Sequence, residues 1–120
     1  MTQLTKAEEE IMHIIWRLER CLVSDILPII EEQRGEKVPQ STISSIVRIL
    51  ESKDFVSHKA YGRTHEYFPI ISKEEYTKST LSRLVSDYFE GSMSNLVSFL
   101  VKEEKLDVDE LSEMIEKMKD

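Results

Sequence analysis

The chain has 120 residues, 40% hydrophobic and 32% charged, which suits a soluble protein with one modest core. No apolar run approaches the roughly 20 residues needed to span a bilayer, and the N-terminus lacks the apolar centre of a signal peptide. The single cysteine, Cys21, excludes an intrachain disulfide and fits a reducing compartment. We therefore expect a cytoplasmic protein without membrane insertion, with Cys21 as a small buried side chain.

The net charge of −7 argues against a nucleic-acid partner until its distribution is considered. Residues 1–71 carry nine basic and eleven acidic side chains, whereas residues 72–120 carry seven and twelve. From Ser41 to Arg63 there are four cations and two acids. The acid is thus concentrated away from that segment. The overall repulsion predicts salt-sensitive DNA binding and favours a dimer, which doubles the contacts.

The first predicted helix follows a capping box, in which Thr5 precedes Glu8 by three residues, and is expected to run to about Glu19. Its apolar residues cover more than half of the circumference, which indicates a helix packed against two neighbours. Trp16 is interpreted as a core residue. The apolar set is Ala7, Ile11, Met12, Ile14, Ile15, Trp16 and Leu18.

A short second helix is predicted over Asp25–Glu32, capped by Ser24. A polar connection containing Gly35 follows, and Pro39 precedes the next helix. The residues that the second helix is expected to bury are Ile26, Ile29 and Ile30.

The third predicted helix begins near Gln40 and is the most informative segment. One face is apolar, because isoleucine, valine and leucine recur at helical spacing; these residues are Ile43, Ile46, Val47 and Leu50. The side chains of the opposite face are mostly short and polar, and none is a carboxylate. This face can therefore approach a nucleic-acid groove, where its hydroxyls can reach phosphates or base edges. An ordinary surface helix is the alternative. The candidate DNA-binding residues here are Gln40, Ser41, Thr42, Ser44, Ser45 and Arg48.

Two β-rich segments, Phe55–Ala60 and Thr64–Pro69, follow this helix and are joined by a turn. Gly62 supplies the positive φ that a tight turn favours. The predicted hairpin carries three further DNA-binding candidates near its tip, His58, Lys59 and Arg63. Three helices followed by a basic hairpin predict a winged helix-turn-helix, with the third helix in a major groove and the wing beside the neighbouring backbone.

After Pro69 the pattern is all-helical. Capping boxes begin at Ser72 and Asp107, and Gly91 ends the helix between them. Fewer than 50 residues cannot enclose a good core, so residues 72–120 are predicted to form a symmetric dimerisation domain behind a DNA-binding domain of residues 1–71. Folding back onto the winged helix is the alternative. The predicted dimer contacts are Leu96, Val97, Leu100, Val101, Leu111, Met114, Ile115 and Met118.

Neither catalysis nor a cofactor is predicted. The sequence has no zinc-protease, P-loop or dinucleotide-binding motif. His58 and His65 flank the hairpin turn and could form a metal site together with Cys21. Two histidines without a fixed third ligand are only weak evidence for such a site. The competing function is a winged-helix protein-interaction module without sequence-specific DNA binding. That function would require large apolar residues on the outer face of the third helix.

The chain resembles the BlaI/MecI/CopY family of penicillinase and methicillin-resistance repressors in three segments that together cover nearly all of it. These are LTKAEEEIMHIIW, STISSIVRILESKDFVSHKAYGRTHEYFPII and GSMSNLVSFLVKEEKLDVDELSEMIEKM. The resemblance implies a homodimeric winged-helix repressor that binds a palindromic operator in double-stranded DNA. It also implies inactivation by a membrane sensor protease that cuts the C-terminal domain.

The resemblance also assigns roles to single residues. Ser41 and Thr42 match base-reading positions, whereas Arg48, Lys59 and Arg63 match regions that contact the DNA backbone. The family's scissile Asn-Phe pair aligns with Phe99-Leu100. Ile49 stands where family members often have arginine, and Pro39 where a capping serine is common. The copper-responsive branch carries C-terminal cysteine motifs that are absent here, which argues against copper sensing.

Overall fold

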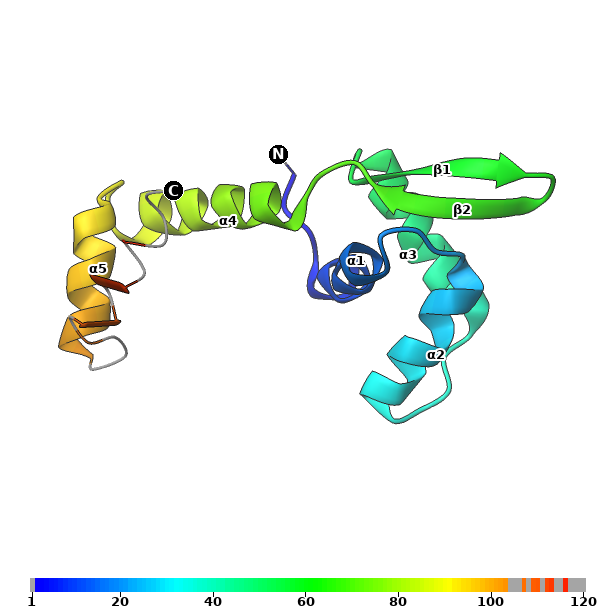
Figure 1. Cartoon of the computed structure of the whole chain (residues 1–120), viewed down its shortest axis with the longest axis horizontal. Helices are drawn as coiled ribbons and strands as arrows, with labels where there is room; N and C mark the ends of the chain where they lie inside the picture. Colours follow the sequence, from blue (N-terminus) through cyan, green and yellow to red (C-terminus); the bar gives the residue numbers. More distant parts are fainter. Residues whose placement is uncertain (1, 104–106, 108, 111, 114–115, 117–120) are drawn as a thin grey trace. The chain divides into compact units, whose positions relative to one another are not determined.

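The computed structural model describes residues 2–103, 107, 109–110, 112–113 and 116. The chain divides into two compact units, residues 1–78 and 79–120. This division falls within the fourth helix, and the domain boundary expected between residues 71 and 72 stays a prediction. The predicted fold class is confirmed, since three helices are followed by an antiparallel hairpin and further helices (Figure 1).

The first helix, α1 (Lys6–Leu18), begins as predicted. The Glu8 N–H donates to Thr5 Oγ1 at 3.2 Å, and the Thr5 N–H donates to Glu8 Oε1 at 3.0 Å. Both donors are backbone N–H groups at the start of the helix, where such groups have no intrahelical acceptor.

The second helix, α2 (Val23–Arg34), is longer at both ends than predicted. Ser24 is not its N-cap, so that prediction was wrong. The Asp25 carboxylate accepts the Leu22 N–H at 2.8 Å, and this contact starts the helix two residues earlier. At the other end Gly35 adopts a left-handed φ of +72°, which ends the helix.

The third helix, α3 (Gln40–Ser52), packs against both α1 and α2 (Figure 1). The strands β1 (Val56–Tyr61) and β2 (Thr64–Pro69) then pair antiparallel, with Gly62 at φ +64° in the turn. The first strand starts one residue later than expected, because the Phe55 N–H donates back to the Leu50 carbonyl at 3.0 Å.

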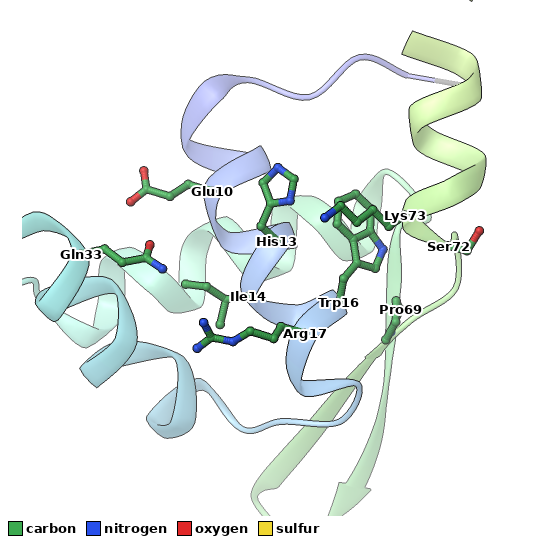
Figure 2. Close-up of a pocket in the computed structure, with 9 residues that line it drawn as sticks. All are labelled: Glu10, His13, Ile14, Trp16, Arg17, Gln33, Pro69, Ser72 and Lys73. Atoms are coloured by element: carbon green, nitrogen blue, oxygen red, sulfur yellow. The ribbon is translucent and has the colours of Figure 1, made fainter. Parts of the chain in front are cut away.

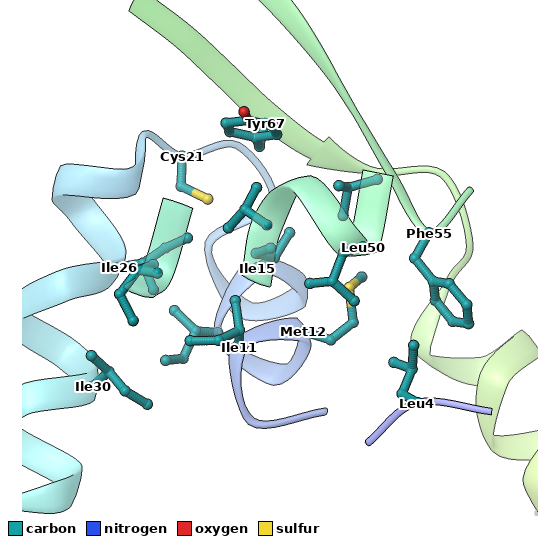
Figure 3. Close-up of a cluster of buried hydrophobic side chains, with 14 of the residues drawn as sticks. Leu4, Ile11, Met12, Ile15, Cys21, Ile26, Ile30, Leu50, Phe55 and Tyr67 are labelled. Carbon is teal, nitrogen blue, oxygen red and sulfur yellow. The ribbon is translucent and has the colours of Figure 1, made fainter. Parts of the chain in front are cut away.

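The core of the first unit joins all three helices to the hairpin (Figure 3). Cys21 is buried as predicted and pairs with Tyr67 through two backbone hydrogen bonds of 3.0 and 2.7 Å. These bonds attach β2 to the segment after α1. Burial, with Asp25 and Glu66 nearby, raises the pKa of the Cys21 thiol to about 11. The side chains with no exposed surface include Ile11, Met12, Ile15, Ile26, Ile30, Ile43, Val47, Leu50 and Phe55.

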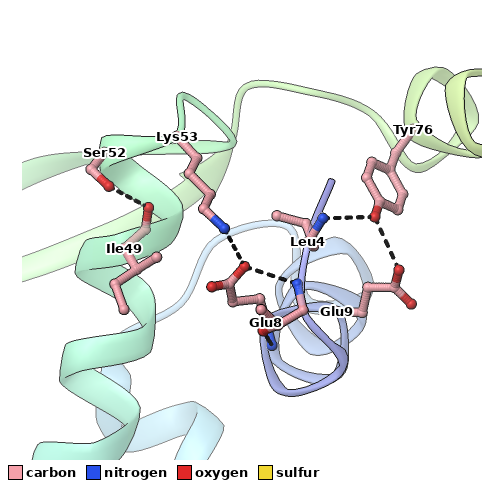
Figure 4. A network of polar contacts seen from close by, with 8 residues as sticks. Leu4, Glu8, Glu9, Ile49, Ser52, Lys53 and Tyr76 are labelled. Atoms are coloured by element: carbon pink, nitrogen blue, oxygen red, sulfur yellow. Dashed lines mark hydrogen bonds and ion pairs between the residues drawn. The ribbon is translucent and has the colours of Figure 1, made fainter. Parts of the chain in front are cut away.

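A polar network closes one end of this core (Figure 4). Glu8 is only 6% exposed, and its carboxylate accepts from Lys53 Nζ at 2.6 Å. Burial raises the pKa of Glu8, but the Lys53 and Thr5 hydrogen bonds outweigh it and hold the pKa below its ordinary value. The Tyr76 hydroxyl accepts the Leu4 N–H at 3.3 Å and donates to Glu9 at 3.0 Å.

The remaining helices are α4 (Lys73–Tyr88) and α5 (Met93–Lys102). The cap predicted at Ser72 is present, because Ser72 Oγ accepts the Glu75 N–H at 3.0 Å. The helix α5 is capped by Ser92, whose Oγ accepts the Asn95 N–H at 3.1 Å. The Asp107 carboxylate accepts the Glu110 N–H at 2.6 Å. Four of the predicted dimer contacts, Leu111, Met114, Ile115 and Met118, lie outside the described residues.

Within the part of the chain that the structure describes, no helix combines the length and the apolar character needed to cross a membrane.

Candidate nucleic-acid interface

The two faces of α3 differ as the sequence predicted. Ile43, Val47 and Leu50 have no exposed surface, and Ile46 is half-buried. The DNA-binding candidates lie on the other sides of the helix and form a surface of hydroxyls, one carboxamide and one guanidinium. Of these, Gln40, Ser41, Thr42, Ser45 and Arg48 are exposed and Ser44 is half-buried.

A groove of about 430 Å³ runs beside this surface, between the start of α2, α3 and the hairpin. It brings Arg48 of α3 together with Arg63 of the turn. Its lining contains no carboxylate, so the guanidinium groups make it cationic. A cationic groove of hydroxyls and guanidinium groups suits phosphate oxygens. The lining residues are Leu22, Val23, Ser24, Gln40, Ser44, Arg48, Arg63, Thr64, His65 and Tyr67.

Sequence reasoning missed the contribution of α2 and β2 to this groove. Ser24 was interpreted as a cap, and Thr64 and Tyr67 only as strand residues. In helix-turn-helix proteins, the helix before the recognition helix crosses the DNA backbone. The position of Ser24 at the start of that helix could therefore have identified it as a candidate.

The hairpin divides its candidates between two faces. The His58 and His65 rings stack at 4.1 Å, and His58 also lies 5.5 Å from the Tyr67 ring, so these side chains share one face. Lys59 pairs with Glu66 across the strands and therefore lies on the opposite face. The structure thus brings Arg63, but not Lys59, to the groove.

A short contact links the hairpin to the end of α3. His58 Nδ1 lies 2.6 Å from a carboxylate oxygen of Glu51. Burial and the Glu51 charge raise the pKa of Tyr67, partly offset by Arg48. In the described residues, no group of three or more potential ligands could hold a metal ion.

One apolar residue interrupts the outer surface of α3. Ile49 is 42% exposed, although its neighbours on that side are polar. A large apolar patch there would favour a protein-interaction module, but a single exposed isoleucine is ordinary for a protein surface.

A second hollow, of about 770 Å³, is larger than the groove (Figure 2). Residues of α1, α2, β2 and the start of α4 surround it. Beside this hollow, the indole N–H of Trp16 donates to the Ile71 carbonyl at 2.8 Å. This hydrogen bond fixes one edge of the indole ring, and the ring packs against the core. Its charged lining has both signs, with Glu10 held by Arg34 at 3.1 Å. This charge pattern suits phosphate less well than the groove does.

The chain matches the model of the penicillinase repressor family over residues 4–120. Among curated proteins, the methicillin resistance regulatory protein MecI of Mammaliicoccus sciuri is 25% identical, with 93% of this chain and 89% of the relative covered. MecI of Staphylococcus aureus strain N315 is 24% identical over the same shares.

Solved structures agree on the fold. The solution structure of the DNA binding domain of the repressor BlaI gives a TM-score of 0.53 at 24% identity, covering 62% of this chain and 88% of that one. A structure of H. salinarum RosR gives a TM-score of 0.54 at 22% identity, covering 86% and 94%. At these identities the structural likeness establishes the fold alone, whereas the match to the family model establishes the family. This chain therefore belongs to the penicillinase repressor family of winged-helix transcriptional repressors.

Proposed function

We propose that this protein is a homodimeric repressor that binds a palindromic operator in double-stranded DNA. The observation that carries the proposal is the cationic groove, in which Arg48 and Arg63 flank the hydroxyl-bearing side of α3. The names of the curated relatives, regulatory proteins of methicillin resistance, support the same class of function.

Different contacts are proposed for the helix and the wing. Ser41 and Thr42, exposed in the first turn of α3, read base edges in the major groove, with Gln40, Ser44 and Ser45 beside them. Arg48 and Arg63 contact phosphates on the groove side. His58 is restrained by Glu51, and Lys59 lies on the far face of the hairpin, so both are weaker candidates.

Dimerisation is proposed to use the apolar surface of the second unit. Leu84, Tyr88, Phe89, Leu96, Phe99 and Leu100 line a wholly apolar hollow of about 380 Å³. Burying such a surface against an identical copy removes it from water and holds two DNA-binding units together. Val97 and Val101, both half-buried on α5, extend the same proposed interface.

Inactivation by a membrane sensor protease is part of the proposal, with Phe99-Leu100 as the cleavage position. This peptide bond lies inside α5, a hydrogen-bonded helix. A protease would therefore require local opening of α5. Cleavage would remove Leu100 and everything after it, and the second half-site would no longer be bound at high effective concentration.

The DNA-binding proposal is tested with the full chain and random-sequence duplexes. We expect selection of a palindrome whose half-sites are separated by about one helical turn or a multiple of it. Arg63→Ala should weaken binding to every sequence and reduce the slope of log affinity against log salt by about one. Thr42→Ala should weaken mainly the selected sequence, by about 1–3 kcal/mol.

Lys78→Ala is the matched control, because it removes an exposed cation of α4 outside the groove. It should leave the selected sequence unchanged. If no duplex is preferred over bulk DNA at physiological salt, sequence-specific binding is wrong and the protein-interaction alternative gains. If Arg63→Ala changes the preferred sequence instead of the salt slope, the two roles are misassigned.

A further inference from the structure

The exposed side chain of Ile49 lies on the same surface of α3 as the residues proposed to read base edges. It lies seven residues after Thr42 and four after Ser45, so the helical repeat places these three side chains on the same side. Their exposure agrees with that placement, since Thr42 and Ser45 are exposed and Ile49 is 42% exposed.

The backbone at Ile49 is firmly held. Ser52 Oγ donates to the Ile49 carbonyl at 2.7 Å (Figure 4). The adjacent cation, Lys53, is already bound to Glu8 at 2.6 Å. Isoleucine is β-branched and has few rotamers in a helix. Ile49 therefore presents methyl groups at a well-defined position, and the short serines around it allow close approach.

The chemistry of the major groove limits what can cover this side chain. Base edges there offer hydrogen-bond donors and acceptors, together with one apolar group, the C5-methyl of thymine. An isoleucine placed against a polar edge would desolvate that edge without forming a hydrogen bond, which costs free energy. Against a thymine methyl, both partners leave water at a gain.

We propose that Ile49 is a specificity-determining residue that selects a thymine in each operator half-site through contact with its C5-methyl group. This inference rests on the proposed function, because it requires α3 to lie in a major groove. It extends that function by assigning the base that the C-terminal half of α3 recognises. The hydroxyls of Ser41 and Thr42 would read other positions.

The test uses the full chain and the duplex that the wild-type chain selects from random sequences. Each thymine is replaced in turn by deoxyuridine, which removes only the C5-methyl group. At one position in each half-site, the loss should weaken wild-type binding about fourfold, and about fifteenfold when both half-sites are changed. Ile49→Ala should bind the thymine and deoxyuridine duplexes equally.

Two further variants exclude a general effect. Ile49→Val keeps a branched apolar side chain and should retain part of the thymine preference. Ile70→Ala removes another exposed isoleucine, 53% exposed and outside α3, and should retain all of it.

The outcomes separate the two proposals. If the wild-type chain selects no sequence, the proposed function fails and the inference falls with it. If a sequence is selected but every deoxyuridine replacement affects wild type and Ile49→Ala equally, the inference alone is overturned. A loss of affinity in Ile49→Ala that is uniform over all sequences would also overturn it.

Discussion

Residues 1–78 enclose a continuous apolar cluster, whereas Val85 and Leu96 are the only buried apolar residues among the described residues of 79–120. The second unit instead exposes large apolar side chains in quantity, namely Leu81, Leu84, Tyr88, Met93 and Phe99. We therefore expect the first unit to fold by itself and the second to require a further surface, which the proposed dimer would provide.

The largest expected effect comes from separating the two regions. A chain of residues 1–78 should fold cooperatively as a monomer, with an unfolding midpoint independent of protein concentration. A chain ending at Phe99 should also be monomeric, and should bind the operator about 10²–10⁴-fold more weakly than the full chain. Analytical ultracentrifugation and gel shift measure these results.

The fragment of residues 1–78 supplies the monomeric baseline for the longer truncation. A tight-binding dimer that survives in the chain ending at Phe99 would show that cleavage there cannot inactivate the repressor.

A pair of phenylalanine substitutions separates the regions within the full chain. Phe55 has no exposed surface, whereas Phe99 is 50% exposed. Phe55→Ala should lower the free energy of unfolding of the first unit by about 3–5 kcal/mol, because it leaves a cavity. Phe99→Ala should leave that transition unchanged and raise the dimer dissociation constant. Urea denaturation followed by circular dichroism, with sedimentation, distinguishes them; equal loss of stability in both variants would contradict the division.

The ion pair between Lys53 and Glu8 gives a smaller effect inside the first unit. Lys53→Met removes the cation that donates to the buried Glu8 carboxylate and should cost about 2 kcal/mol at pH 7. The folded-state pKa of Glu8 is below its ordinary value of 4.5, so its stabilising contribution is present above that pH. It is lost as the pH falls through the lower folded-state value. The stability gap between wild type and Lys53→Met should therefore narrow in acid.

Lys78→Met is the matched control, since Lys78 and Glu74 form a 3.4 Å pair with both side chains more than three-quarters exposed. It should change the unfolding free energy by less than about 0.5 kcal/mol. A stability gap for Lys53→Met that stays constant from pH 7 to pH 3 would contradict the assigned charge interaction.

Local signals made most of the fold predictable from the sequence. The boxes at Thr5 and Ser72 and the turn at Gly62 depend on residues within three positions of each other. The start of α2 was misassigned because Asp25, not Ser24, provides the cap. The Glu8–Lys53 pair joins residues 45 positions apart, and a capping glutamate gives no sign that it will also be buried.

The candidate site was predictable only in part, for a similar reason. Helical periodicity identified the outer surface of α3, and the turn identified Arg63. Strand alternation alone places His58 and Lys59 on opposite faces of the hairpin. It could not show which face lies toward the groove, because this depends on how the hairpin packs against α3. The residues contributed by α2 likewise depend on tertiary packing. The base and phosphate roles stay predictions.

Trp16 is the only tryptophan of the chain, and its indole N–H is fixed to the Ile71 carbonyl just before α4 begins. The unlabelled protein therefore carries its own optical probe at this junction. Release of that hydrogen bond would expose the half-buried indole to water and move its emission to longer wavelength. Stopped-flow fluorescence could then time events at the base of α4 during operator binding or proteolysis, without a dye or an introduced residue.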